Sequence, residues 1–592
     1  MRSRRLALLT AAACAALVLP LTTAAAETPD PASPSDPGTP GAGALFSPQL
    51  VTVRTPSSAA RAVLAGLGLD GTEHADPDVA TVVLHTEAQR EALAASGLTT
   101  RVDIADLFLH EARNNLANAA YAARTKRSPL PSGRDTYRTL SDYESEMRTL
   151  ARRHRGLVKR ITLPHVTLDG HAVHGLEIGH RIRRAASGQP TLLMVGLHHA
   201  REWPSGEHTM EFAYDLVRGF GSDKQVTRLL GKVRVVIVPV VNVDGFDLSH
   251  TSGGLIDLNV LNPLDPSDQV LPIATQLTPG FAYLRKNCRL VDGVDTPDGT
   301  CAAQLSTPAG FSLGVDLNRN YGMWWSGPGS AAALPDAQAF TAGILDPRYH
   351  GASAFSEPET RNVRSLVLGR PVTTLITNHT SGNLVLWPFS GAPDNVSETG
   401  RRVGIARDDQ ALAELGKRFA RQNGYTPQRS YALYDGMGTT EDWAYGATGT
   451  FGYTFEIGPT EFHPPFEDVV DQYVGTGRYA GKGNRAAYLL ALKHAADAGS
   501  HSVIAGRAPA GARLVLTRNA DTPTWDGTSR ARYRISMRVP RSGRFAWHVN
   551  PSTRPIVQGR ERYRLEVRAG GRRLGKQQVL VKRGERVRLD LR

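Results

Sequence analysis

The chain has 592 residues. This is too many for one ordinary core, so an allowance of about 150 residues per domain predicts two to four folded units. Hydrophobic residues make up 41% and charged residues 21%, which is typical of a soluble protein. The net charge of +13 is unevenly placed: from Val503 onward there are 22 Lys and Arg against 6 Asp and Glu, so the basic character belongs to the C-terminal part and says nothing about an active site.

The N-terminus has the composition of a secretory signal. Three arginines (Arg2, Arg4 and Arg5) precede an apolar run from Leu6 to Leu21, and small residues end at Ala26. This order predicts a signal peptide over residues 1–26 and a secreted, extracellular protein. The apolar run is too short to span a membrane, and no later stretch is long enough, so we expect no membrane span.

Residues 27–130 form the next predicted region. Residues 27–46 are rich in Pro, Gly, Ser and Thr, as in a disordered leader. Strand-like runs at 51–54 and 79–85 and helix-like runs at 57–65 and 87–96 then predict a small α+β unit. We interpret it as a prosegment, because Arg124, Lys126 and Arg127 stand in a linker suited to activation cleavage. The alternative is a minor structural domain without an inhibitory role.

Residues 135–499 have the pattern of an α/β domain. Apolar β-prone runs occur at 192–196, 233–241, 373–377 and 451–457. Helical patterns occur at 144–153, where Ser141 is the predicted cap, and at 206–218 and 480–495. This alternation predicts a mixed, mostly parallel sheet with helices on both faces.

Residues 503–592 consist of short alternating runs broken by Gly, Pro and Asn, such as 514–517, 532–539 and 563–567. This pattern predicts a C-terminal β-sandwich. Its positive charge suits an anionic surface as a partner, and a passive accessory module is the alternative.

Two cysteines, Cys288 and Cys301, remain after removal of the predicted signal peptide. A single pair in an exported protein predicts a disulfide that closes a surface loop, and two free thiols are the alternative.

The segment GLHHAREW (residues 196–203) follows a short apolar strand. His199 and Glu202 are three residues apart, so in a tight turn or a first helical turn both side chains can reach one ion. His198 competes for this role, because it is four residues from Glu202. Histidine and glutamate suit zinc, and a third ligand from elsewhere would leave a position for water.

Four further segments carry residue types that zinc peptide hydrolysis would use. They are TTLITNHTSGN with His379, GYTFEIG with Glu456, GVDLNRNYG with Asn318 and Arg319, and YLRKNCR with Arg285. Together with GLHHAREW they resemble the zinc carboxypeptidases of the pancreatic carboxypeptidase A and B type, and the resemblance covers about residues 137–495.

The resemblance implies a set of roles. His199, Glu202 and His379 would hold one Zn²⁺ per chain, which selects His199 over His198. Glu456 would act as the general base toward a zinc-activated water, and Arg285 would stabilise the oxyanion. Asn318 and Arg319 would hold the terminal carboxylate of the substrate, Arg201 would add positive potential, and Tyr434, eight residues before Asp442, would close over the substrate.

Glu441 stands where the same family has the residue at the bottom of the specificity pocket. A buried carboxylate there favours a cationic side chain, so we expect a basic or mixed C-terminal preference.

The sequence therefore predicts a monomeric secreted metallocarboxypeptidase, made as a precursor, that acts on peptides or proteins with a free C-terminus and does not bind nucleic acid. Two alternatives stay open. One is a cell-wall peptide amidase or endopeptidase of the same fold, and the other is a non-catalytic binding protein.

Overall fold

The computed structural model describes residues 46–72, 76, 78–183, 188–251, 281–290, 301–302, 304, 313–331, 346–551 and 561–592. The chain divides into two units, Met1–Ala44 and Leu45–Arg592, and every described residue belongs to the second. The predicted signal peptide and most of the predicted leader lie outside the described residues. No helix among the described residues combines the length and the apolar character needed to cross a membrane.

The first sheet along the chain has four antiparallel strands, in the spatial order β2-β3-β1-β4. The hydroxyls of Ser57 and Thr86 cap the two helices that belong to it, so each helix begins close to its predicted position. A longer helix, α3, follows and carries Arg124 as its last residue, so this arginine is not in the linker as predicted. The elements are β1 (Gln49–Arg54), α1 (Ser58–Gly66), β2 (Asp70–Thr72), β3 (Val79–Leu84), α2 (Glu87–Ala95), β4 (Thr100–Ile104) and α3 (Leu107–Arg124).

An eight-stranded sheet forms the centre of the next region, in the order β11-β10-β12-β9-β7-β8-β6-β5. Parallel pairing joins β8, β7, β9 and β12 in that spatial order, and every residue of these four strands is buried, which explains their continuous apolar character. The strands are β5 (Val158–Val166), β6 (Ala172–Ile178), β7 (Thr191–Val195), β8 (Arg234–Val238), β9 (Val372–His379), β10 (Leu384–Trp387), β11 (Thr426–Arg429) and β12 (Phe451–Glu456).

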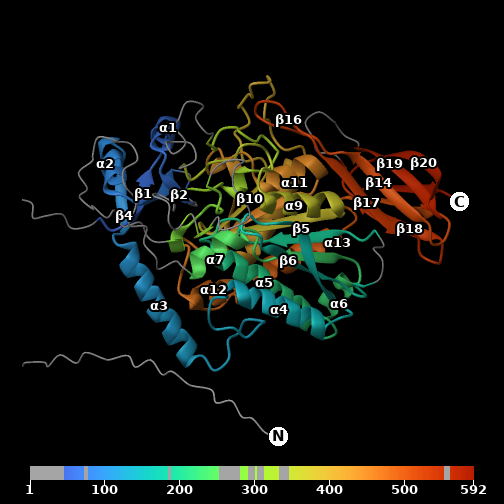
Figure 1. Cartoon of the computed structure of the whole chain (residues 1–592), viewed down its shortest axis with the longest axis horizontal. Coiled ribbons are helices and arrows are strands. Elements are labelled where there is room, and N and C mark those ends of the chain that lie inside the picture. Colours follow the sequence, from blue (N-terminus) through green and yellow to red (C-terminus); the bar gives the residue numbers. More distant parts are fainter. Residues whose placement is uncertain are drawn as a thin grey trace, which may run out of the picture. The chain divides into compact units, whose positions relative to one another are not determined.

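Helices cover both faces of this sheet, with α9 and α11 on one side and α4 and α5 on the other (Figure 1). The predicted α/β class with a mixed sheet is therefore confirmed. The helices are α4 (Leu140–Arg153), α5 (Trp203–Gly219), α6 (Lys224–Leu230), α7 (Val243–Thr251), α9 (Pro358–Gly369), α10 (Asp409–Asn423), α11 (Thr440–Thr448), α12 (Phe466–Val474) and α13 (Asn484–Ala496).

Two helix starts differ from the prediction. Thr139, not Ser141, caps α4, because its hydroxyl accepts from the amide of Asp142 while the Asp142 carboxylate accepts from the Thr139 amide. Helix α13 begins at Asn484 rather than Ala480, since Gly481 takes a positive φ of 76° that an L-residue helix does not allow.

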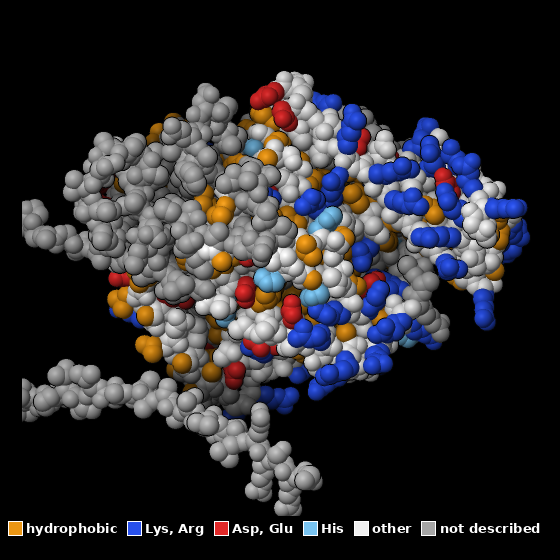
Figure 2. Space-filling view, viewed as in Figure 1, with side chains coloured by type: hydrophobic (Ala, Val, Ile, Leu, Met, Phe, Trp, Pro, Cys, Tyr) orange, Lys and Arg blue, Asp and Glu red, His pale blue; other side chains and the backbone are white. Residues whose placement is uncertain are grey.

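The C-terminal strands form a three-stranded sheet (β18-β13-β21), a four-stranded sheet (β17-β14-β19-β20) and a small β15-β16 pair. Buried and exposed residues alternate along β17, as expected for a sheet with one face in a core. Lys and Arg side chains gather over these strands (Figure 2). The strands are β13 (Ser502–Arg507), β14 (Arg513–Asn519), β15 (Thr522–Pro523), β16 (Thr528–Ser529), β17 (Arg532–Arg538), β18 (Arg544–Val549), β19 (Glu561–Ala569), β20 (Arg572–Val581) and β21 (Arg586–Asp590).

Candidate metal centre and substrate cavity

Three neighbouring parallel strands bring the central residues together. His379 and Glu456 are the last residues of β9 and β12 and lie opposite each other in the sheet. His199 follows the end of β7, which pairs with β9 on its other side. Because the carboxyl ends of parallel strands meet at one edge of a sheet, His199 and His379, which are 180 positions apart, lie around one point together with Glu456.

The side chains of His199, Glu202 and His379 face one another and are buried. Nδ1 of His199 lies 2.6 Å from Oε1 of Glu202, and Nδ1 of His379 lies 2.9 Å from Oε2 of the same carboxylate. The two Nδ1 atoms are 3.3 Å apart. A tetrahedral zinc ion with bonds of about 2.0–2.2 Å holds its ligand atoms about 3.3 Å apart, which the two Nδ1 atoms match, while the histidine–carboxylate distances are shorter. Two histidines and one glutamate are a donor set that fits zinc.

Asp316 connects the metal ligands to Arg285. Its Oδ1 lies 3.0 Å from Nε2 of His199, and its Oδ2 accepts from Nε and Nη2 of Arg285 at 3.1 and 3.0 Å. A carboxylate on the distal nitrogen fixes the tautomer and the direction of a ligand histidine. Sequence reasoning missed Asp316, although it lies in the GVDLNRNYG segment two residues before Asn318.

His198, the competing histidine, makes different contacts. Its Nε2 lies 2.8 Å from the hydroxyl of Tyr321 and 3.2 Å from that of Thr440, and its Nδ1 lies 3.2 Å from the hydroxyl of Thr377. Both ring nitrogens thus bind hydroxyl groups in the core, and His198 stands outside the group formed by His199, Glu202 and His379.

A cavity of about 370 Å³ adjoins the three ligand side chains. It is lined by His199, His379, Glu456, Asn318, Arg319, Tyr434, Glu441, Leu386, Ser390, Ser430, Leu433, Gly436, Thr439 and Thr454. Most of the residues that the sequence singled out therefore share one space. Arg201, Arg285 and Glu202 do not line it.

Arg319 and Tyr434 form one wall of the cavity. The Arg319 guanidinium donates to the carbonyls of Gly329 and Asn318 at 3.1 and 3.0 Å, and Nη2 lies 3.4 Å from the hydroxyl of Tyr434. Tyr434 is 36% exposed, the most solvent-accessible of the predicted site residues. The Asn318 amide oxygen accepts from the amide and the hydroxyl of Thr440, so α11 fixes this segment.

Glu441 is buried in the wall of the cavity, with 2% of its surface exposed. Its Oε1 accepts a hydrogen bond from the hydroxyl of Ser390 at 3.1 Å. Its Oε2 is buried and has no hydrogen-bond partner among the described residues. A buried carboxylate oxygen without a donor is costly, so the pocket is suited to a ligand that brings a hydrogen-bond donor or a positive charge.

Arg201 does not line the cavity and instead contacts β2 of the four-stranded N-terminal sheet. Both Nη atoms of its buried guanidinium bind the carboxylate of Asp70 in β2, with Nη2 2.9 Å from Oδ1, and the Phe462 ring lies 4.0 Å away. Burial would raise the pKa of Asp70, but the charge of Arg201 and the hydrogen bonds from His85 and Arg201 hold it well below its usual range. Because the pKa of Asp70 is lowered, the ion pair between Asp70 and Arg201 stabilises the fold fully at pH values above the ordinary pKa of an aspartate. This stabilisation is lost only as the pH falls through the lowered pKa.

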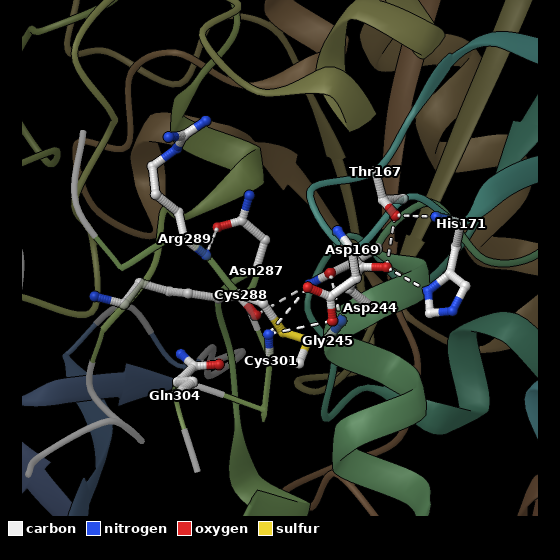
Figure 3. Close-up of a disulfide and its surroundings, with 12 residues drawn as sticks. Thr167, Asp169, His171, Asp244, Gly245, Asn287, Cys288, Arg289, Cys301 and Gln304 are labelled. Carbon is white, nitrogen blue, oxygen red and sulfur yellow. Dashed lines mark hydrogen bonds and ion pairs between the residues drawn. A yellow bond between two sulfur atoms is a disulfide. The ribbon is translucent and has the colours of Figure 1, made fainter. Parts of the chain in front are cut away.

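Arg285 lies in a short segment that side chains hold from several directions. Cys288 and Cys301 are joined in a disulfide, and the Cys301 amide donates to the carboxylate of Asp169 at 3.1 Å (Figure 3). Nearby, the Asn287 amide and the Arg289 guanidinium donate to Glu357 at 2.7 and 2.9 Å. These contacts fix the backbone that directs Arg285 toward Asp316.

A model of the zinc carboxypeptidase family matches residues 143–475, which is more than half of the chain. A zinc carboxypeptidase of Saccharothrix mutabilis subsp. capreolus is 25% identical over 469 residues, 78% of this chain and 91% of that protein. Human carboxypeptidase B is 24% identical over 329 residues, 55% of this chain and 64% of that protein, which is less than two thirds of its length.

Solved structures show the same fold. Carboxypeptidase A from Helicoverpa armigera aligns with a TM-score of 0.58 and 18% identity over 76% of this chain and 98% of that one. Thrombin-activatable fibrinolysis inhibitor aligns with a TM-score of 0.52 and 18% identity over 76% of this chain and 99% of that one. Family match, fold and the two-histidine, one-glutamate donor set agree, and we conclude that this chain belongs to the zinc carboxypeptidase family.

Proposed function

We propose that the chain is an exported metallocarboxypeptidase that carries one zinc ion and removes the C-terminal residue from peptides or proteins. The observation that carries this proposal is that zinc-type ligands, a buried carboxylate (Glu456) and an arginine–tyrosine pair (Arg319 and Tyr434) line one cavity. The three ligand residues and Glu456 provide the groups that hydrolysis of a peptide bond needs. Arg319 provides the positive charge that recognises the C-terminal carboxylate of a peptide.

Each residue has a distinct task in this proposal. When bound, zinc would lower the pKa of a water molecule and polarise the scissile carbonyl. Glu456 takes a proton from the attacking water and delivers it to the leaving amine. The Arg319 guanidinium binds the terminal carboxylate of the substrate, and Tyr434 closes over it. Arg285, which Asp316 holds next to the ligand histidine outside the cavity lining, steadies the charge that develops on the carbonyl oxygen.

A panel of blocked dipeptides that end in Arg, Lys, Phe, Leu or Asp tests the proposal. After trypsin treatment, we expect release of the C-terminal residue, inhibition by 1,10-phenanthroline and recovery with added zinc. Release from no member, with zinc measured as bound, would contradict a carboxypeptidase and favour a cell-wall peptide amidase of the same fold.

The specificity pocket supports a preference for C-terminal Arg or Lys, because the buried Oε2 of Glu441 lacks a partner among the described residues. Replacing Glu441 with Gln removes the charge and keeps the shape. We expect kcat/KM for the Arg substrate to fall about 100-fold, since leaving a buried cation unpaired costs about 3 kcal/mol. The Phe substrate should change less than threefold, and an equal loss for both substrates would refute this role.

We propose that the α+β region from β1 to α3, within residues 27–130, is an inhibitory prosegment. Asp70 of this region binds both Nη atoms of Arg201, a residue that the resemblance assigns to the substrate cleft but that does not line the cavity itself. Further contacts come from α3, where Asn114 donates to the carbonyl of His463 at 3.0 Å and Asn118 accepts from the amide of Phe466 at 2.7 Å. Lys126 and Arg127, just beyond α3, are exposed and suited to cleavage.

Replacing Asp70 with Asn should activate the uncut chain. Breaking a buried ion pair costs about 3–5 kcal/mol, so the undocked fraction should rise about 100-fold or more, up to full activity. The measurement is the ratio of kcat/KM before and after trypsin, with Asp103→Asn in the exposed strand β4, at the opposite edge of the same sheet, as the control. Equal activity of the cut and uncut wild-type chains would show that the unit does not inhibit.

A further inference from the structure

The four-stranded C-terminal sheet has two chemically different faces. Tyr533, Ile535 and Met537 of β17 are buried, and the residues between them point to the other side. Strand β19 follows the same alternation, with Leu565 among its buried residues, whereas β14 is buried from Leu514 to Arg518 and exposed at its two ends, Arg513 and Asn519. The outer face therefore carries mostly polar and charged side chains, with Val515 and Leu580 as apolar exceptions.

Six exposed arginines lie on this outer face, and we name them the arginine face. The strand register places them close to one another: Arg513 lies opposite Arg538, while Thr517 lies between Arg534 and Arg564 on its two neighbouring strands. The Lys and Arg side chains gathered over these strands are visible in Figure 2. The arginine face consists of Arg513, Arg532, Arg534, Arg538, Arg562 and Arg564.

Carboxylates do not balance this charge among the described residues. Glu566, the acidic residue on the outer face of β19, already binds Arg568 through Nε and Nη2 at 3.1 and 2.7 Å. Two members of the arginine face have only neutral partners: Arg513 donates to the hydroxyl of Ser536 and Arg562 to the amide oxygen of Gln578. Like charges so close together repel one another, so an anionic partner would relieve an existing cost.

One end of the arginine face is hollowed. The hollow encloses about 700 Å³ and includes Arg532, Arg562 and Arg564 in its lining. Arg518 also lines it, but this buried arginine is neutralised by Glu561 at 3.3 Å. The remaining lining residues are Thr517, Asn519, Tyr563 and Gln578. The hollow is thus a polar, positively charged recess that could seat an anionic group.

We propose that the arginine face binds a linear polyol phosphate, a polymer whose anionic groups are phosphodiesters without bases. Side chains on one face of a strand recur about every 7 Å and neighbouring strands lie about 5 Å apart, so the arginines form a grid suited to repeated charges. A guanidinium binds a phosphate with two parallel hydrogen bonds, which a lysine cannot do.

Other polyanions fit this face less well. The large exposed hydrophobic residues among the described C-terminal strands are Leu574 and Leu580, and none is aromatic, so bases of a nucleic acid would find no stacking platform. Two leucines also give little apolar area for insertion into a bilayer. The predicted export signal adds that the folded protein would meet envelope polymers rather than intracellular nucleic acid.

Binding of a fluorescent poly(glycerol phosphate) to the full chain tests the proposal. We expect binding that weakens about 100-fold between 50 and 200 mM salt, because several phosphates are neutralised together. A variant with Arg513→Gln, Arg534→Gln, Arg538→Gln and Arg564→Gln should bind at least 10-fold more weakly. The matched control removes four exposed arginines from the three-stranded sheet, Arg507→Gln, Arg544→Gln, Arg586→Gln and Arg588→Gln, and should lose less than threefold.

Both variants lose the same net charge, so equal weakening would show that only total charge matters and would overturn the proposal. Tighter binding to single-stranded DNA of equal length, or to vesicles of anionic lipid, would show that the partner is a nucleic acid or a membrane and would overturn the proposal. Absence of binding at 50 mM salt would refute the proposal that the arginine face is a binding surface for anionic polymers. Unchanged hydrolysis of a blocked dipeptide and an unchanged melting temperature show that each variant is folded.

Discussion

Glu456→Gln is expected to lower kcat by about 100- to 10,000-fold, the range that general acid–base catalysis contributes. Glu456 is 4% exposed, lines the substrate cavity and ends β12 beside His379. Glutamine has nearly the same shape, but its amide cannot accept and return a proton at neutral pH. The measurement is steady-state hydrolysis of the best dipeptide substrate by the trypsin-treated variant.

Zinc content and the melting temperature should stay close to those of the wild type, because Glu456 is not one of the three ligand residues. Glu414→Gln, on the exposed side of α10, serves as a control that also removes one carboxylate. A Glu456→Gln enzyme that keeps more than one tenth of its activity with zinc fully bound would exclude this residue as the base.

His379→Ala is expected to remove both bound zinc and activity. Two protein ligands, His199 and Glu202, would remain where catalytic zinc sites use three, so we expect zinc per chain to fall about 10-fold or more after dialysis. Atomic absorption measures the metal independently of catalysis. The sheet should survive, since the backbone of β9 pairs with a strand on each side.

His198→Gln is the matched control, because His198 is a buried histidine next to His199 that contacts hydroxyl groups rather than the ligand group. It should lose stability and keep its zinc. If His198→Gln loses zinc and His379→Ala retains it, the assignment of ligands is wrong.

The sequence determined the elements whose signals are local. Continuous apolar runs revealed the buried strands β7, β9 and β12, because a parallel strand covered on both faces needs apolar residues at every position. Helix starts were less accurate: the capping box at Thr139 and the glycine conformation before Asn484 depend on side-chain and backbone geometry that periodicity does not describe.

The motifs also indicated which residue types would form the site, since His199 and Glu202 lie on one turn and His379 and Glu456 each end an apolar run. Only the tertiary structure decided their neighbours. Asp316 contacts His199 across 117 positions of sequence, and Asp70 binds Arg201 across 131 positions. Local patterns report burial and direction within one element, whereas the order of strands and the docking of separate units decide which distant charges meet.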